Sequence, residues 1–168
     1  MNALLIIANK NFRDEEFFIT KEELEKNKIS LVIASSEIKE SKGMFGKTIT
    51  PNILLKDADA KNYDTIIFIG GSGTSEYFNN ETTLNLAKSA YKENKIVAAI
   101  CIAPVILANA GILKGKRATV SESLANKITS KGAKYVDEDF VVDGKIITAD
   151  GPSASRAFVR EIIKALKK

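Results

Sequence analysis

The only cysteine of this chain, Cys101, stands between an apolar run and a segment that contains a proline. The run Ile96–Ile100 is apolar throughout, which is typical of a parallel strand buried on both faces. The small and apolar residues up to Ala110 favour a buried helix directly afterwards. A cysteine at such a strand-to-helix elbow faces free backbone N–H groups and the positive end of the helix dipole. Both favour the thiolate, so the position predicts a reactive nucleophile, although free cysteine is also common in cores.

The absence of histidine limits what this cysteine can do. A cysteine-histidine dyad cannot form within the chain, and a homo-oligomer cannot supply the base because every subunit lacks it. A single cysteine also excludes an intramolecular disulfide and a cysteine-rich zinc site. We therefore expect no metal ion and no cofactor. The glycine-rich run Gly70–Gly73 lacks the lysine and the spacing of a phosphate-binding loop.

The bulk composition is that of one globular domain over residues 1–168. Hydrophobic residues make up 45% of the chain, which is enough for a full core. The net charge of +4 comes from lysines mixed with acidic residues, and this pattern argues against nucleic-acid binding. The N-terminal segment does not have the features of a signal peptide, and no apolar stretch reaches the roughly 20 residues of a membrane helix. The predicted location is cytoplasmic.

Apolar runs and helical patterns alternate along the chain. Buried strands are predicted over Ala3–Ala8, Ile29–Ala34, Thr65–Ile69 and Ile96–Ile100, with a fifth strand over Arg117–Val120. Helices are predicted over Asp14–Asn27, Glu81–Asn94, the elbow segment to Ala110, Ser123–Ser130 and Ser153–Lys167. The remaining segments predict a small hairpin excursion over Ser35–Ile53, a polar connection over Leu54–Tyr63 and a hairpin over Phe140–Ala149 that turns at Asp143-Gly144.

This alternation indicates an α/β fold with a mainly parallel sheet that helices cover on both faces. Ligands of such folds bind at the carboxyl ends of the strands. The residues at those ends include Asn9, Gly70, Cys101 and Asp150.

Several segments, in order and at the right spacing, resemble the DJ-1/PfpI superfamily, which shares the class I glutamine amidotransferase-like fold. The resemblance covers nearly the whole chain and is carried by Ala3–Asn9, Phe12–Glu16, Ile69–Gly71, Ala98–Pro104, Ala110–Lys116, Gly132–Glu138, Val141–Thr148 and Gly151-Pro152. It implies a flavodoxin-like three-layer sandwich with a nucleophile elbow at Cys101.

The resemblance implies that the elbow cysteine is paired with a glutamate of the first helix. That residue is Glu16, or Glu15 if the register slips by one. From the residues alone, Glu16 is an ordinary first-turn acid, a position that is usually solvated. Buried beside the sulfur, it would have a raised pKa and stay protonated. It could then donate a hydrogen bond to the sulfur or move protons during attack on a carbonyl.

The backbone around the elbow could supply an oxyanion hole. If Gly70-Gly71 approaches Cys101 closely, the N–H groups of Gly71 and Ile102 would form it, whereas a simple strand-end turn is the alternative. Possible pocket residues lie at predicted strand ends, where turn or cap roles are the alternative: Asn9, Gly70, Asp150 and Ser153.

One departure from the family pattern concerns histidine. Members of the PfpI type carry a histidine directly after the cysteine, where this chain has Ile102 as an apolar wall. Other relatives carry one in the segment where this chain has Ser121 and Glu122. Loss of a general base costs on the order of 10² to 10⁴ in rate, which argues against a cysteine peptidase or amidase.

Four functions remain open, and whether the protein is an enzyme is among the open questions. Cys101 could sense or scavenge peroxide, with Glu16 stabilising its sulfenic or sulfinic acid. Cys101 could instead add to small aldehydes or glycated adducts, as in glyoxalase or deglycase-type enzymes. The alternatives are a PfpI-type peptidase and a non-catalytic interaction domain. The resemblance also implies a homo-oligomer. The first two functions imply a small carbonyl compound or peroxide as partner, and the charge pattern and the lack of a long apolar stretch argue against nucleic acid and membrane as partners.

Overall fold

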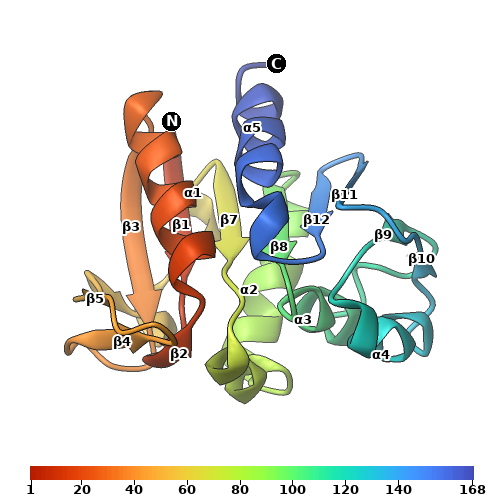
Figure 1. Ribbon diagram of the computed structural model, residues 1–168. Helices are drawn as coiled ribbons and strands as arrows, with labels where there is room; N and C mark the ends of the chain where they lie inside the picture. The colour runs from red at the N-terminus through yellow and green to blue at the C-terminus, as the bar shows by residue number, and fades with distance from the viewer.

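The computed structural model describes residues 1–168 and is built around a seven-stranded sheet (Figure 1). Its strands are β1 (Asn2–Ile6), β3 (Ser30–Ser35), β6 (Ile53–Leu54), β7 (Thr65–Phe68), β8 (Ile96–Ile100), β11 (Phe140–Asp143) and β12 (Ile146–Ala149). They lie in the order β11-β12-β8-β7-β1-β3-β6, and every neighbouring pair is parallel except β11 with β12. The hairpin predicted at Asp143-Gly144 is this antiparallel pair, and that prediction is confirmed.

Helices cover both faces of the sheet. They are α1 (Asp14–Lys26), α2 (Glu81–Lys92), α3 (Pro104–Asn109), α4 (Ala125–Thr129) and α5 (Ser155–Leu166). Figure 1 shows α1 and α5 side by side in front of the sheet, whereas α2 and α3 contribute to the core on the opposite face. The predicted three-layer sandwich with a mainly parallel sheet is confirmed.

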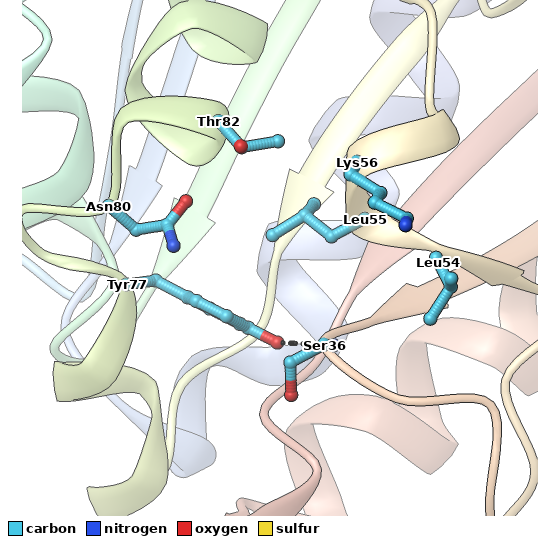
Figure 2. A pocket seen from close by; sticks show the side chains of 7 residues that line it. All are labelled: Ser36, Leu54, Leu55, Lys56, Tyr77, Asn80 and Thr82. Carbon is cyan, nitrogen blue, oxygen red and sulfur yellow. Dashed lines mark hydrogen bonds between the residues drawn. The ribbon is translucent and has the colours of Figure 1, made fainter.

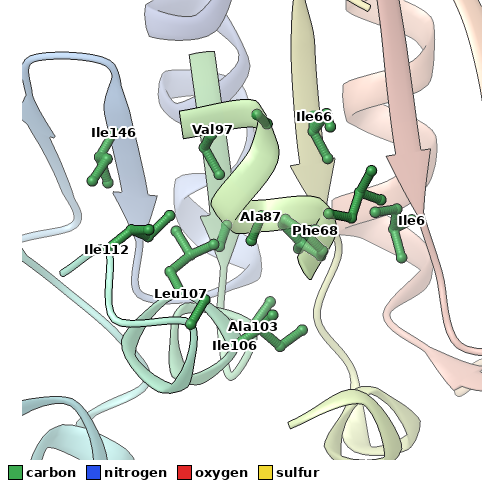
Figure 3. Close-up of a cluster of buried hydrophobic side chains, with 14 of the residues drawn as sticks. Ile6, Ile66, Phe68, Ala87, Val97, Ala103, Ile106, Leu107, Ile112 and Ile146 are labelled. Carbon is green, nitrogen blue, oxygen red and sulfur yellow. The ribbon is translucent and has the colours of Figure 1, made fainter. Parts of the chain in front are cut away.

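The central strands β1, β7 and β8 are apolar at almost every position because each face of the sheet has its own core. In β1, Leu4 and Ile6 face the cluster formed with α2 and α3, whereas Leu5 faces the cluster formed with α1 and α5. Figure 3 shows the first cluster, in which Phe68 of β7 lies near Ala87 of α2. Full burial of a side chain of this size contributes about 1.5–3 kcal/mol. A slip of one residue would exchange the two faces, so this burial fixes the strand register.

A second, three-stranded sheet lies beside the carboxyl ends of the main strands. It consists of β2 (Lys10–Phe12), β4 (Ser41–Gly43) and β5 (Thr48–Ile49), and it confirms the predicted hairpin excursion. The buried carboxylate of Asp14 accepts the backbone N–H groups of Phe45 and Lys47 at 2.8 and 3.0 Å. A Cβ at Gly43 would lie 2.5 Å from this carboxylate, so glycine allows the hairpin to dock on the first turn of α1.

Three sequence-based boundaries need correction. The predicted fifth strand is only β9 (Arg117–Ala118), which pairs with β10 (Lys134–Tyr135) outside the main sheet. The place beside β8 is occupied by β12, and Thr119 donates its backbone N–H to the side chain of Thr148 at 2.9 Å instead of extending a ladder.

The other two corrections concern a connection and helix starts. The predicted polar connection begins with the end of β6 and contains two short 3₁₀ turns, at residues 55–57 and 60–62. The last two helices each begin with a 3₁₀ turn, so their α-helical parts start at Ala125 and Ser155, two residues later than predicted. None of the helices is both long and apolar enough to cross a membrane.

Candidate active site

Cys101 occupies a strained turn between β8 and α3. Its φ angle is +65°, a left-handed conformation that costs a residue with a side chain roughly 1–2 kcal/mol. Backbone hydrogen bonds on both sides hold it there. Cys101 donates its N–H to Ala149 at the end of β12, and its carbonyl accepts the N–H of Ser121, at 2.9 and 2.8 Å. The predicted strand-to-helix elbow is therefore present, and its thiol is only partly buried.

Glu16 of α1 reaches the elbow from the neighbouring layer. Its side chain is fully buried, and Oε2 accepts the backbone N–H of Gly70 at 2.8 Å. Oε1 is equally buried but has no hydrogen-bond partner. Glu15, the alternative register, is 45% exposed and forms an ion pair with Arg13 at 2.9 Å. The carboxyl group next to Cys101 is therefore that of Glu16.

Gly70 lies between these two side chains and has no room for a side chain of its own. A Cβ at Gly70 would lie 2.6 Å from Cys101 Cβ, 2.6 Å from Glu16 Oε2 and 2.8 Å from the Ile100 carbonyl oxygen. The next residue, Gly71, has a φ angle of +106°, and a Cβ there would lie 2.3 Å from the Arg13 nitrogen. The glycine pair therefore packs its backbone against Cys101 on one side and against Arg13 on the other.

Burial sets the ionisation of both groups. It raises the pKa of Glu16 to about 7, against the lowering effect of the Gly70 N–H. This direction agrees with the sequence-based expectation for Glu16. Burial also raises the pKa of Cys101, to about 12, and the negative charge of an ionised Glu16 adds to this. Hydrogen bonds from the backbone of Gly71 and Ile102 lower the pKa of the thiol but do not outweigh burial and charge.

The expectation that the elbow alone favours the thiolate is therefore wrong while Glu16 is ionised. The dipole argument counted the N–H donors around Cys101 but left out the cost of burying its charge. It also left out the neighbouring carboxylate, whose repulsion disappears when Glu16 carries a proton.

The four possible pocket residues have different surroundings. Asn9 is buried and donates to Ser41 Oγ at 3.0 Å, whereas Ser153 is exposed. Gly70 is packed against the elbow, as described above. Asp150 is half-buried, its Oδ1 has no partner, and burial raises its pKa, as does the nearby Asp139. None of these residues lines any of the five surface cavities.

One of these cavities, of about 280 Å³, lies next to Tyr77 rather than next to Cys101 (Figure 2). The Tyr77 hydroxyl donates to the Ile7 carbonyl at 2.9 Å and accepts the Ser36 N–H at 3.0 Å. Its polar atom is therefore engaged in holding the ends of β1 and β3 together, and the cavity contains neither Cys101 nor Glu16.

Comparisons with known proteins identify the family. The model of the DJ-1/PfpI family matches residues 1–165. The chain belongs to the DJ-1/PfpI family. Among its relatives is an uncharacterised protein of Methanocaldococcus jannaschii, 42% identical over 99% of this chain and 82% of that protein. A deglycase of Pyrococcus abyssi is 29% identical over 98% of this chain and 99% of the relative.

Two further comparisons agree with this family. A glutathione-independent glyoxalase of Caenorhabditis elegans is 29% identical over 99% of this chain and 89% of the relative. The solved structure of a ThiJ/PfpI domain protein from Brachyspira murdochii superposes with a TM-score of 0.97. It is 31% identical and covers 99% of this chain and 96% of the other.

The positions at which the family pattern suggested histidine lie next to the elbow in this DJ-1/PfpI protein. Ile102 follows Cys101 directly, and the backbone N–H of Ser121 donates to the carbonyl of Cys101. The side chains of Ile102 and Ser121 cannot act as bases near neutral pH. Glu122, the other residue of the second position, carries a carboxylate but is exposed.

Sequence reasoning missed three residues around the elbow. Asp14 anchors the hairpin, Phe45 lies at the hairpin tip, and Arg13 stacks on Phe45 with its guanidinium carbon 4.7 Å from the ring centroid. Asp14 and Arg13 stand in the segment that carried the resemblance, but nothing in their spacing indicates a partner about 30 residues away.

Replacing Gly70 by alanine tests the close packing between Cys101 and Glu16. We expect Gly70→Ala to lower the free energy of unfolding in urea by about 1–3 kcal/mol, because the new methyl group overlaps both side chains. Gly151→Ala is the matched control, since a Cβ there meets nothing within 4 Å. Gly151→Ala should lower the free energy of unfolding by no more than about 0.5 kcal/mol. Equal effects of the two substitutions would contradict the packing described here.

The raised pKa of Glu16 predicts a pH-dependent stability. Between pH 4.5 and about 7 the folded state holds a proton that the unfolded state has lost, so the free energy of unfolding falls as pH rises. The shift corresponds to a loss on the order of 3 kcal/mol. Glu16→Gln should remove this slope in urea unfolding measured from pH 4.5 to 7, whereas Glu15→Gln should retain it. A slope that survives in Glu16→Gln would show that Glu16 ionises normally.

Proposed function

We propose that this protein converts small aldehydes through a covalent adduct on Cys101, with Glu16 as the group that moves protons. The observation that carries the proposal is the Glu16 carboxyl group, which is fully buried next to the thiol with Oε1 unpartnered. A buried carboxylate oxygen without a donor is costly, whereas a protonated one can donate to the sulfur. The geometry therefore supports a proton on Glu16.

The two groups titrate as a coupled pair. Removing one proton from the pair leaves one negative charge, which can rest on either side chain. On the sulfur, this charge receives hydrogen bonds from the backbone of Gly71 and Ile102, and a protonated Glu16 would add a third. On the carboxylate, it receives two, from the Gly70 N–H and from the Cys101 thiol. We therefore place the charge on Cys101 and the proton on Glu16 Oε1.

The proposed reaction begins with attack of the Cys101 thiolate on the aldehyde carbon. A carbon–sulfur bond forms, and the carbonyl oxygen takes the proton of Glu16 to give a hemithioacetal. The developing negative charge on that oxygen would be stabilised by the N–H groups of Gly71 and Ile102. Each group required for this step is present in the chain, and no histidine is needed.

A 2-oxoaldehyde can then isomerise on the enzyme. The Glu16 carboxylate removes the proton from the former aldehyde carbon, and the electron pair moves into the neighbouring carbonyl, whose oxygen takes that proton from Glu16 to give an enediol. Glu16 then accepts the proton of the hydroxyl group on the first carbon and delivers it to the second carbon, which leaves a thioester on Cys101. Water hydrolyses the thioester, releasing a 2-hydroxy acid and the free thiol. One aldehyde and one water give one hydroxy acid, so no external oxidant is required.

Relatives named deglycase and glyoxalase support this assignment. A peptidase is less well supported, because Ile102 and Ser121 cannot deliver a proton to an amine leaving group. The exposed hairpin side chains Met44 and Phe45 are compatible with the proposed homo-oligomer, since they present apolar surface beside the elbow.

Oxidation sensing is a second candidate that uses the same residues. The backbone donors of Gly71 and Ile102 and the protonated Glu16 would also stabilise the oxygen atoms of a sulfinic acid on Cys101. Addition of two oxygen atoms after treatment with sub-stoichiometric peroxide, detected by intact mass, would support this candidate if it weakened in Glu16→Gln.

Turnover of methylglyoxal to lactate tests the proposed enzyme. Cys101→Ser and Glu16→Gln should each lower kcat/KM by on the order of 10²-fold or more, because one removes the nucleophile and the other the proton carrier. Glu15→Gln is the control and should retain the wild-type rate. Absence of turnover by the wild type, or turnover that persists in Cys101→Ser, would refute the proposal.

A further inference from the structure

Arg13 lies on the Gly70–Gly71 side of the elbow, directly against the backbone that packs on Cys101. Its N–H donates to the Gly70 carbonyl at 2.9 Å. A Cβ at Gly71 would lie 2.3 Å from the Arg13 nitrogen, and a Cβ at Gly70 would lie 2.6 Å from Cys101 Cβ. Only the glycine pair therefore separates the main chain of Arg13 from the Cys101 side chain.

The guanidinium group of Arg13 is held in position by two neighbours. Nε and Nη2 donate to the Glu15 carboxylate at 2.9 and 3.3 Å. The guanidinium also lies over the Phe45 ring, 4.7 Å from its centroid. The Asp14 carboxylate holds Phe45 in place by accepting its backbone N–H. The neighbouring Met44 Sδ accepts the Ser72 N–H at 3.5 Å. The hairpin tip and Arg13 therefore form one wall beside Gly70–Ser72.

This wall keeps donor capacity for a ligand. Nη1 of Arg13 has no hydrogen-bond partner in the chain, and the side chain is 26% exposed. Glu15 is more exposed, at 45%, and such surface ion pairs contribute at most about 1 kcal/mol, so a second carboxylate can share or replace it. The negative charges of Glu16 and Cys101 each raise the pKa of Arg13, although Glu15 has the larger effect. The cation therefore lies within electrostatic range of the reacting groups.

We propose that Arg13 selects electrophiles that carry a carboxylate close to the carbon that Cys101 attacks. The planar guanidinium suits a carboxylate because it offers parallel N–H donors, and its stacking on Phe45 fixes its orientation before the ligand arrives. The substrate class is thus anionic carbonyl compounds rather than neutral aldehydes. For turnover, this inference rests on the proposed function, but the selection of an anion by Arg13 can be measured without turnover.

The rim on the β12 side of the elbow has the opposite charge. Asp150 follows Ala149, whose carbonyl accepts the Cys101 N–H, and Asp139 and Asp137 lie near enough to raise the pKa of Asp150. An anionic ligand is repelled from that side. Its carboxylate should therefore point toward Arg13, with the electrophilic carbon at Cys101.

Alkylation of Cys101 by iodoacetate and iodoacetamide tests the selection. The two reagents have nearly the same size and differ in one negative charge, and the chain has no other cysteine to react. The ratio of their rate constants cancels changes in the thiolate fraction. Arg13→Gln should lower the ratio of iodoacetate to iodoacetamide by roughly three- to tenfold at low salt, and the difference should shrink as salt is added. The ratio measured for Arg13→Lys should lie between those of Arg13→Gln and the wild type.

Arg160→Gln is the matched control, since Arg160 is an exposed arginine of α5 without an ion pair, and the substitution changes the net charge equally. Its ratio should equal that of the wild type. An unchanged ratio in Arg13→Gln, an equal change in Arg160→Gln, or failure of both reagents to reach Cys101 would overturn the inference. If the ratio changes as expected but no aldehyde is converted, the proposed function fails and anion selection stands. If aldehydes are converted but the ratio is unchanged in Arg13→Gln, the proposed function stands and the anion selection by Arg13 fails.

Discussion

The burial of one ionisable carboxyl group, that of Glu16, is the constraint on which the rest of the site depends. Because the group has no exposure and only one N–H donor, burial raises its pKa to about 7, so a proton can remain on it near neutral pH. In the proposed reaction, that proton takes the role that a histidine would otherwise fill. The same burial raises the pKa of the neighbouring thiol, and only a protonated Glu16 removes the repulsion that would keep Cys101 inert.

The fold builds this contact from parts that are distant in sequence. The parallel strands β7 and β8 end side by side, which brings Gly70 next to Cys101. The helix α1 begins shortly after β2, and its first turn brings the Glu16 carboxyl group to the Gly70 N–H. Asp14, in that turn, accepts two N–H groups of the hairpin and thereby positions Phe45 against Arg13. The helix start thus organises the proton carrier and the proposed anion-binding wall together.

Much of the fold could be predicted from the sequence, because the buried parallel strands are mostly apolar and turn residues separate them. The elbow at Cys101 followed from the same pattern. The role of Glu16 could not be predicted from this pattern, because three consecutive acidic residues on a helix carry no periodic signal. Only the family resemblance singled out Glu16. The fifth strand was over-extended, since propensity cannot show that β12 occupies the place beside β8. The contact of Arg13 with Phe45 depends on hairpin docking, which local sequence does not encode.

In the proposed site, the charge of the coupled pair rests on Cys101 while the proton rests on Glu16. The most direct measurement is the ultraviolet absorbance of the thiolate as a function of pH, with Cys101→Ser subtracted so that only this thiol contributes. We expect a wild-type midpoint well below the ordinary value of about 8.5, and a higher midpoint in Glu16→Ala, which has lost the donor. A thiolate that forms only above pH 10 in the wild type, with a lower midpoint in Glu16→Ala, would contradict it.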